Sequence, residues 1–286
     1  MIPKICERRD KGLKIVRKVI NRIAVLFAGI VVVNLISGIG KIDREDVVQA
    51  AKNIASYMGT AVDTTADTAE LNYTEDAAEE LKFLGDYVTE QNDNVPAFTK
   101  EDLDKSEGYM YLTDLDGLGR CGMAMMVVSP NTITYEEREP ISDIRPVGFV
   151  QAKYACISDD GNTPGYVYNR MHLLMYHAGG PLRDVRNITT GTRFCNATLM
   201  LTYEDIVVDY VKETGNHVLY RVTPLYKEGE LVPRAVQMEA CSIQDEGEGV
   251  SFNVIAWNVQ PGITINYETG ETTADNGEVS SYMGSQ

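Results

Sequence analysis

The chain has few of the residues that usually identify a metal or nucleophile site. Its 286 residues include three histidines and five cysteines, and no two cysteines have CxxC spacing. A structural zinc site is therefore not expected. Four of the cysteines follow the long apolar run near the N-terminus. Two disulfides and buried free thiols are both open to them, and they are Cys121, Cys156, Cys195 and Cys241.

Basic residues are also scarce, since 26 Lys and Arg face 42 Asp and Glu, for a net charge of −16. This balance argues against a nucleic-acid partner, because phosphate contacts come from Lys and Arg. The basic residues are unevenly distributed, however. Residues 161–200 hold four arginines against a single acid, Asp184. The overall charge therefore does not decide what this region binds.

The N-terminus combines a basic flank with an apolar run. Eight Lys and Arg side chains precede a nearly uncharged stretch from Ile23 to Ile39. About 17 apolar residues are short for a membrane span and long for a signal core. The basic end should stay in the cytoplasm, and no clean A-x-A cleavage site follows. We expect residues 1–40 to be a signal or, preferably, an uncleaved membrane anchor, so that the rest is extracytoplasmic, either anchored or secreted.

The remaining chain divides by composition into a spacer, a globular domain and a tail. Residues 41–95 are acidic, with helical spacing in Asp43–Met58 and a capped helix predicted from Thr74 to Glu90. Residues 96–270 form the globular domain, and the polar tail, residues 271–286, needs no fold. Strand-like runs and one prominent helix, Glu204–Glu213, predict an α+β fold. The runs are Met110–Leu112, Cys121–Val128, Ile188–Thr190, His217–Pro224 and Val250–Val259.

His172 has the strongest catalytic context of the three histidines. Arg170 lies two residues before it, so on a strand the two side chains share one face. A histidine can deprotonate water near neutral pH, and an arginine can hold a phosphate. Together they suit attack on a phosphodiester. His177 precedes a Gly-Gly-Pro turn, so we interpret it as a loop residue. His217 could be a second base or a structural part of a strand.

A second cluster of polar residues follows His172. Asn187 and Asn196 are nine residues apart, and Glu204 is eight residues further on. Neutral and anionic oxygens of this kind suit a hard cation such as Mg²⁺. On spacing alone, loop residues or helix caps are the better interpretation of the two asparagines.

The order of these motifs resembles the DNA/RNA non-specific endonucleases of the ββα-metal (His-Me finger) class, and the DNA-entry type nucleases in particular. The similarity runs from about Tyr109 to Thr269. The segments that carry it, in order, are Asp114–Arg120, Asn169–His172, Asn187 to Asn196 with Glu204, Thr214–Pro224, Gln237–Ala240, Ser251–Val254 and Asn258–Gly262. The resemblance implies a ββα finger beside a central antiparallel sheet flanked by helices.

The resemblance also implies roles for the matching residues. His172 matches the general base of the Asp-Arg-Gly-His motif and Arg170 its arginine, so both are expected to be catalytic. Asn196 matches the metal-binding asparagine. Glu204 matches the acidic residue associated with the water shell of the metal, and it is also expected to be catalytic. Arg170, Arg193 and Asn187 are expected to bind the substrate, with Asn187 shaping the site.

Two residues depart from the motif, because Asn169 replaces its Asp and Met171 its Gly. In an extended segment Met171 should point away from His172. The departures motivate an alternative, a degenerate protein of the same fold that binds nucleic acid, or acts as a surface interaction protein, without cutting.

The main expectation is an exported endonuclease that hydrolyses DNA and RNA with little sequence preference. Its cofactor would be Mg²⁺, with Mn²⁺ as the other possible ion. Its partners would be the nucleic-acid substrates, the membrane through residues 23–39 if the anchor is uncleaved, and an immunity or uptake partner that the sequence does not identify.

Overall fold

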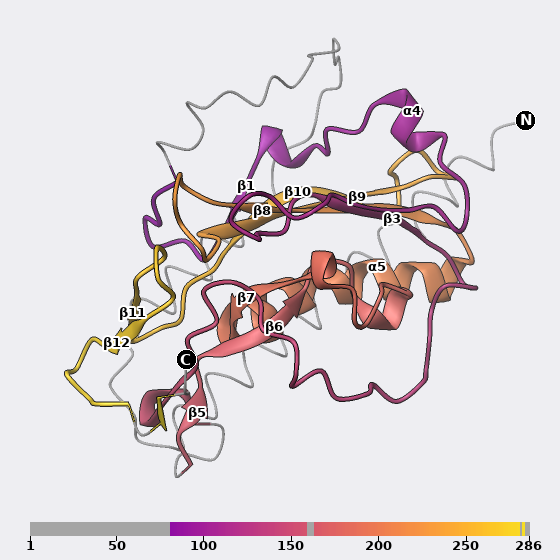
Figure 1. Ribbon diagram of the computed structural model, residues 1–286. Coiled ribbons are helices and arrows are strands. Elements are labelled where there is room, and N and C mark those ends of the chain that lie inside the picture. The colour runs from indigo at the N-terminus through magenta and orange to yellow at the C-terminus, as the bar shows by residue number, and fades with distance from the viewer. Residues whose placement is uncertain (1–80, 159–162, 281, 284–286) are drawn as a thin grey trace, which may run out of the picture. The chain divides into compact units, whose positions relative to one another are not determined.

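The computed structural model describes residues 81–158, 163–280 and the backbone of residues 282–283 (Figure 1). All of them lie in one compact unit, Tyr73–Gln286. The basic flank, the apolar run and the expected helix Asp43–Met58 lie outside the described residues. Within the described ranges, no helix is long and apolar enough to cross a membrane.

A six-stranded antiparallel sheet forms the centre of the domain. Its strand order is β1-β10-β9-β8-β3-β2, and β8, β9 and β10 pair along almost their whole length (Figure 1). This sheet confirms the central element of the predicted α+β fold. Its strands are β1 (Val88–Glu90), β2 (Met110–Leu112), β3 (Ala124–Val128), β8 (Val218–Leu225), β9 (Ala235–Ser242) and β10 (Ser251–Trp257).

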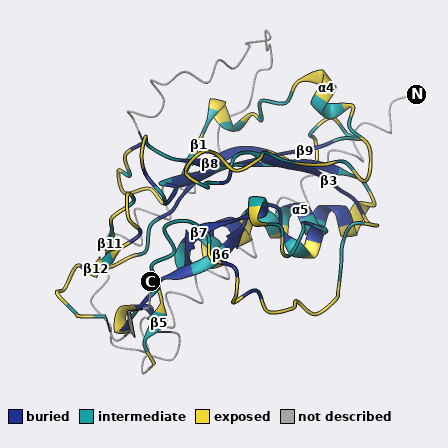
Figure 2. Ribbon diagram, in the orientation of Figure 1, coloured by how far each residue is buried: buried dark blue, intermediate teal, exposed yellow. Residues whose placement is uncertain are grey.

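The largest hydrophobic core lies between one face of this sheet and helix α5 (Leu201–Thr214). Alternate residues of β3, β8, β9 and β10 point into it, because side chains alternate between the faces of a strand. The helix contributes Val207, Tyr210 and Val211. Figure 2 shows the strands and part of α5 in the colour of buried residues. The core thereby fixes the helix that carries Glu204.

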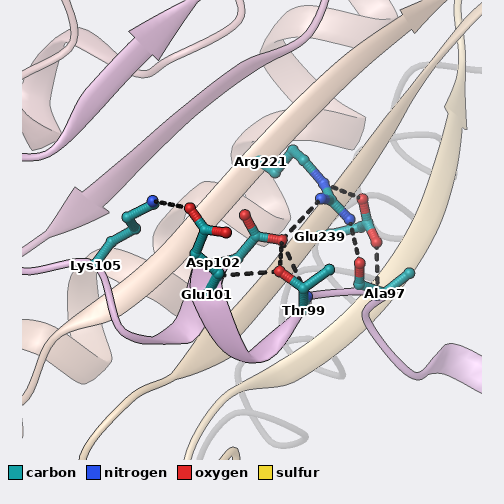
Figure 3. Close-up of polar contacts among 7 residues, drawn as sticks. All are labelled: Ala97, Thr99, Glu101, Asp102, Lys105, Arg221 and Glu239. Atoms are coloured by element: carbon teal, nitrogen blue, oxygen red, sulfur yellow. Dashed lines mark hydrogen bonds and ion pairs between the residues drawn. The ribbon is translucent and has the colours of Figure 1, made fainter. Parts of the chain in front are cut away.

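The opposite face of the sheet is held to the segment of α4 (Lys100–Leu103) by a buried ion pair. The Arg221 guanidinium donates to the Glu239 carboxylate at 2.7 Å, and Glu239 is 3% exposed. Arg221 also donates to the carbonyl of Ala97 at 2.9 Å, and Glu239 accepts from the Ala97 N–H at 2.8 Å (Figure 3). The pair satisfies both charges and ties two segments together.

The ββα unit expected for the finger is present on the α5 side of the sheet (Figure 1). Strands β6 (Tyr168–His172) and β7 (Ile188–Thr192) form an antiparallel pair of their own. A π-helical segment, η5 (Cys195–Met200), follows β7 and continues directly into α5. The predicted helix Glu204–Glu213 is thus correct but begins too late.

Small elements surround this core, and two of them correct the prediction of a tail without fold. Strands β12 and β13 lie within residues 271–286, and the Tyr154 hydroxyl donates to the Thr272 carbonyl at 2.6 Å. The tail therefore pairs with the domain. The remaining elements are β4 (Ala152–Tyr154), β5 (Gly165–Tyr166), β11 (Ile263–Ile265), β12 (Thr272–Ala274), β13 (Tyr282–Met283) and the short 3-10 turns Asn92–Asn94, Ala155–Ile157, Tyr176–Ala178 and Val185–Asn187.

One further prediction of secondary structure was wrong, and one long strand was not predicted. The helix expected from Thr74 to Glu90 is not formed in its described part, because Val88–Glu90 pairs with β10 as a strand. The folded domain therefore begins before residue 96. Strand β9 was missed, since the buried Glu239 interrupts its apolar pattern.

The described cysteines resolve the choice between disulfides and thiols. Cys121, Cys195 and Cys241 are buried free thiols, and Cys156 is an exposed one.

Candidate active site

His172 ends strand β6, with its side chain 7% exposed. Its Nε2 lies 2.9 Å from the carbonyl oxygen of Leu182, and its Nδ1 lies 2.9 Å from the Arg138 guanidinium. A carbonyl only accepts and a guanidinium only donates, so the ring proton belongs on Nε2. Nδ1 then carries the lone pair that could accept a proton.

The surroundings of His172 keep its ring neutral. Its pKa is lowered from 6.5 to about 4, mainly by burial and also by the charge of Arg138, whereas the hydrogen bond to Leu182 opposes both. At neutral pH the imidazole is therefore a free base.

Arg138 is a residue of the candidate site that the sequence did not reveal. It belongs to the loop between β3 and β4, and its guanidinium reaches the His172 ring. Its neighbours Glu136, Glu137 and Glu139 are acidic and exposed. Because a lone arginine among acids gives no local sign of a phosphate site, only the fold identifies it.

Arg170 shares a strand face with His172, as predicted, but its donors are used elsewhere. Its guanidinium donates to the carbonyls of Ile144 and Ser142, the latter at 2.6 Å, and stacks on the Phe149 ring with its centre 4.7 Å from the centroid. These contacts fasten the loop that carries Arg138. The cation that contacts His172 is Arg138 rather than Arg170.

Asn187 is buried, and its amide is fully engaged by backbone. Its Oδ1 accepts from the Leu174 N–H at 2.8 Å, and its Nδ2 donates to the carbonyls of Leu174 and Pro181, both at 3.0 Å. The expected contact of Asn187 with substrate stays a prediction. The side chain shapes the turn that supplies the Leu182 carbonyl to His172.

Asn196 and Glu204 lie on the same continuous helix, and the π turn controls their relative direction. Asn196 lies within η5, and Glu204 within the first turn of α5. Eight residues of α-helix turn by about 800°, which leaves two side chains about 80° apart. One extra residue in a π turn takes up about 100°, so the two side chains end about 20° apart.

Glu204 is half-buried and lies in the electrostatic field of the site. The pKa of its carboxyl is raised to about 8, mainly by burial and also by the charge of Asp205, whereas the charge of Arg138 opposes both. Arg138 therefore links His172 with Glu204. Among the described residues, the side chains of Glu204 and Asn196 have no hydrogen-bond or ion-pair partner. The side-chain oxygen atoms of both can therefore bind a ligand.

Arg193 does not lie beside His172. It follows Thr192, which pairs with Tyr168 at the other end of β6 from His172. Four residues of strand place that end about 13 Å away. His177, in contrast, is an exposed turn residue, as predicted.

His217 and two further arginines have structural partners. The His217 imidazole lies 3.7 Å from Glu107, at the start of β8. Arg183 pairs with Asp143, and Arg186 pairs with Asp184 at 2.7 Å. Much of the local positive charge of residues 161–200 is thus neutralised within the fold.

The departure at Met171 is accommodated away from the site. Met171 is fully buried in the main core, on the opposite strand face from His172. A Cβ at Gly191 would lie 2.3 Å from the Met171 sulfur, so the missing side chain of Gly191 provides its space. The predicted direction of Met171 is confirmed.

The chain is similar to known nucleases in sequence and in fold. Residues 100–244, just over half of the chain, match the family model for DNA/RNA non-specific endonuclease. Among solved structures, NucA from Streptococcus agalactiae with magnesium ion bound is 27% identical, with a TM-score of 0.56 over 66% of this chain and 87% of that one.

A second solved structure, the Sda1 nuclease with bound zinc ion, shares the fold at 24% identity and a TM-score of 0.52, over 66% of this chain and 97% of that one. The family match and the ββα unit that carries His172, Asn196 and Glu204 show that this chain belongs to the DNA/RNA non-specific endonucleases of the His-Me finger class.

Proposed function

We propose that this endonuclease is exported and metal-dependent, and that it hydrolyses phosphodiester bonds in DNA and RNA with His172 as general base. The observation that carries the proposal is the fixed, neutral His172 ring, whose proton is held on Nε2 by the Leu182 carbonyl. Its Nδ1 can therefore take a proton from the water that attacks phosphorus. General bases of this kind contribute roughly 10²–10⁴-fold to the rate.

Arg138 would act when the substrate arrives. In the free protein its guanidinium donates to Nδ1 of His172, at 2.9 Å. A phosphate is a stronger partner for a guanidinium than a neutral imidazole is, because both partners are charged and two parallel hydrogen bonds can form. The phosphate would therefore draw Arg138 away from His172. This exchange would expose Nδ1 of His172 and at the same time place the Arg138 cation on the phosphate.

Asn196 would hold the metal ion and Glu204 would lie beside it. An amide oxygen and a half-buried carboxyl group fit a hard cation such as Mg²⁺ or Mn²⁺. The charge of the cation would favour the ionised form of Glu204, whose pKa burial otherwise raises. Among the described residues no three His, Cys, Asp or Glu side chains converge as a metal site, which suits an ion that keeps much of its water. When bound, the ion neutralises the charge that develops on the phosphate and the leaving oxygen. Magnesium in NucA and zinc in Sda1 support a divalent ion.

Cutting without sequence preference follows from what the site offers. Arg138 and a metal ion would contact the phosphate, which carries no base information. Export is supported by the eight basic residues and the apolar run Ile23–Ile39. An extracytoplasmic nuclease would meet DNA and RNA outside the cell.

The test is digestion of supercoiled DNA and of RNA by the full-length protein, with Mg²⁺ or Mn²⁺ and with a chelator. We expect His172→Ala to keep its fold and lose at least about 100-fold in rate. The matched control is His177→Ala, which removes an exposed turn histidine and should cut normally. Arg138→Ala should also lose activity, because it removes the phosphate partner. Undiminished cutting by His172→Ala would exclude His172 as the base.

A further inference from the structure

The start of the helix that carries Asn196 is held by a segment more than 60 residues away in sequence. The Oγ1 of Thr192 accepts from the Cys195 N–H at 3.0 Å and donates to the Val259 carbonyl at 2.7 Å. The Oε1 of Gln260 accepts from the Phe194 N–H at 3.0 Å. Two N–H groups in the first turn are thus satisfied, and one of the two acceptors comes from outside the finger.

Asn258 holds the strand that leads into this helix. Its side chain is fully buried, and its Oδ1 accepts from the Thr192 N–H at 2.7 Å. Its Nδ2 donates to the carbonyls of Thr190, at 3.1 Å, and Pro233, at 2.8 Å. Strand β7 has a strand partner only on its β6 side in the described sheets. The amide of Asn258 therefore replaces a neighbouring strand along the other edge of β7.

A π-helical first turn has particular need of such support. The first N–H groups of a helix have no partner within the helix, and π geometry is rare and occurs mostly as single turns. Phe194, the residue before η5, offers no side-chain cap of its own. Asn196 lies two residues after Phe194, within this turn. Its amide direction therefore depends on how the turn is held.

We propose that Asn258–Gln260 is a positioning clamp for Asn196, and that Gln260 acts through the Phe194 N–H on the affinity for the metal ion. The inference rests on the proposed role of Asn196 in metal binding. Gln260 itself contacts neither metal nor substrate in this scheme. Groups that orient metal ligands typically change metal affinity by about 10–100-fold when removed.

Three variants of the full-length protein separate this role from general stability. Gln260→Met removes the acceptor at similar size, whereas Gln260→Glu keeps an oxygen that can accept from Phe194. Gln244→Met is the matched control, because the Gln244 Oε1 also accepts a backbone N–H, that of His217 at 2.7 Å. That bond lies beyond the C-terminal end of the same helix.

Two measurements are needed, and neither uses cleavage. Hydrogen exchange of residues 193–200 in the metal-free protein reports the clamp, and electron paramagnetic resonance of free Mn²⁺ reports the affinity for the ion. In Gln260→Met we expect faster exchange in this segment and roughly 10-fold weaker Mn²⁺ binding. Gln260→Glu and Gln244→Met should resemble the wild type in both.

The outcomes distinguish the clamp from the proposed function. Unchanged exchange in Gln260→Met would overturn the clamp. Faster exchange with unchanged Mn²⁺ affinity, or equal weakening in Gln244→Met, would overturn its effect on the metal ligand. A wild-type protein that binds no Mn²⁺ and cuts no nucleic acid would overturn the proposed function, while the exchange data would still decide the clamp.

Discussion

Protonation of His172 should destabilise the folded protein, because the fold is built around its neutral ring. The side chain is 7% exposed, and its Nδ1 faces the positive guanidinium of Arg138 at 2.9 Å. A proton on Nδ1 would remove the acceptor and place two cations in contact. The pKa of His172 is accordingly lowered, to about 4, by burial first and by Arg138 in addition.

The size of the effect follows from this pKa. In the unfolded chain His172 titrates near its ordinary value of 6.5, so between pH 6.5 and 4 the unfolded state binds more protons. Stability from the neutral ring is therefore complete above pH 6.5 and is lost as the pH falls toward 4. The full loss is about 3 kcal/mol, because one pKa unit corresponds to about 1.4 kcal/mol. By pH 5 about 2 kcal/mol should already be lost.

The assay is denaturant unfolding of the wild type and of His172→Gln at pH 7 and pH 5. Other groups titrate in both proteins, so the difference between the two free energies of unfolding isolates His172. We expect that difference to shift by about 2 kcal/mol between the two pH values, with the wild type losing more at pH 5. Parallel pH dependence of the two proteins would refute the buried, neutral state of this ring.

Two further predictions concern the packing of the finger and its π turn. Gly191→Ala places a Cβ 2.6 Å from the Cβ of Met171 and should lower the free energy of unfolding by about 1–3 kcal/mol. The control, Gly117→Ala, places a Cβ with nothing within 4 Å and should change this free energy little. Equal denaturation midpoints of the two variants would contradict this packing. Deleting Ala197, an exposed residue of the π turn, should restore α-helical winding and leave the Asn196 and Glu204 side chains about 20° apart, because the seven remaining α-helical steps turn by about 700°. Cleavage and Mn²⁺ binding should therefore be largely kept, and loss of both with an unchanged circular dichroism spectrum would contradict this account of how the π turn aligns the two side chains.

Local sequence patterns predicted the strands whose own residues are apolar or alternate between apolar and polar. The strands around Met110–Leu112 and His217–Pro224 alternate or are uniformly apolar, and they lie where the sequence places them. Strand β9 was not predicted, because Glu239 lies in the middle of its apolar sequence. Its charge is compensated by Arg221 on the neighbouring strand, which is a contact that no local pattern contains.

The assignment of roles within the site shows the same division. The spacing of Arg170 and His172 correctly placed both on one face of a strand, yet Arg170 binds loop carbonyls. Arg138 lies 34 residues before His172 among glutamates, and only loop closure brings it to the ring. Asn187 was expected to shape the site and to contact substrate, and only the structure shows that its amide bonds to the backbone of Leu174 and Pro181.

The sequence by itself determined the family, the place of His172 and Arg170 on one face of a strand and the helix with Glu204, because ordered motifs and helical or strand spacing are local properties of the chain. The tertiary structure decided which nitrogen of His172 is unprotonated, which arginine donates to it, and how the helical turn that carries Asn196 is held. Those properties depend on Leu182, Arg138 and Gln260, whose contacts exist only after distant segments pack together. Burial then sets the protonation state, since the same imidazole in water would titrate near pH 6.5.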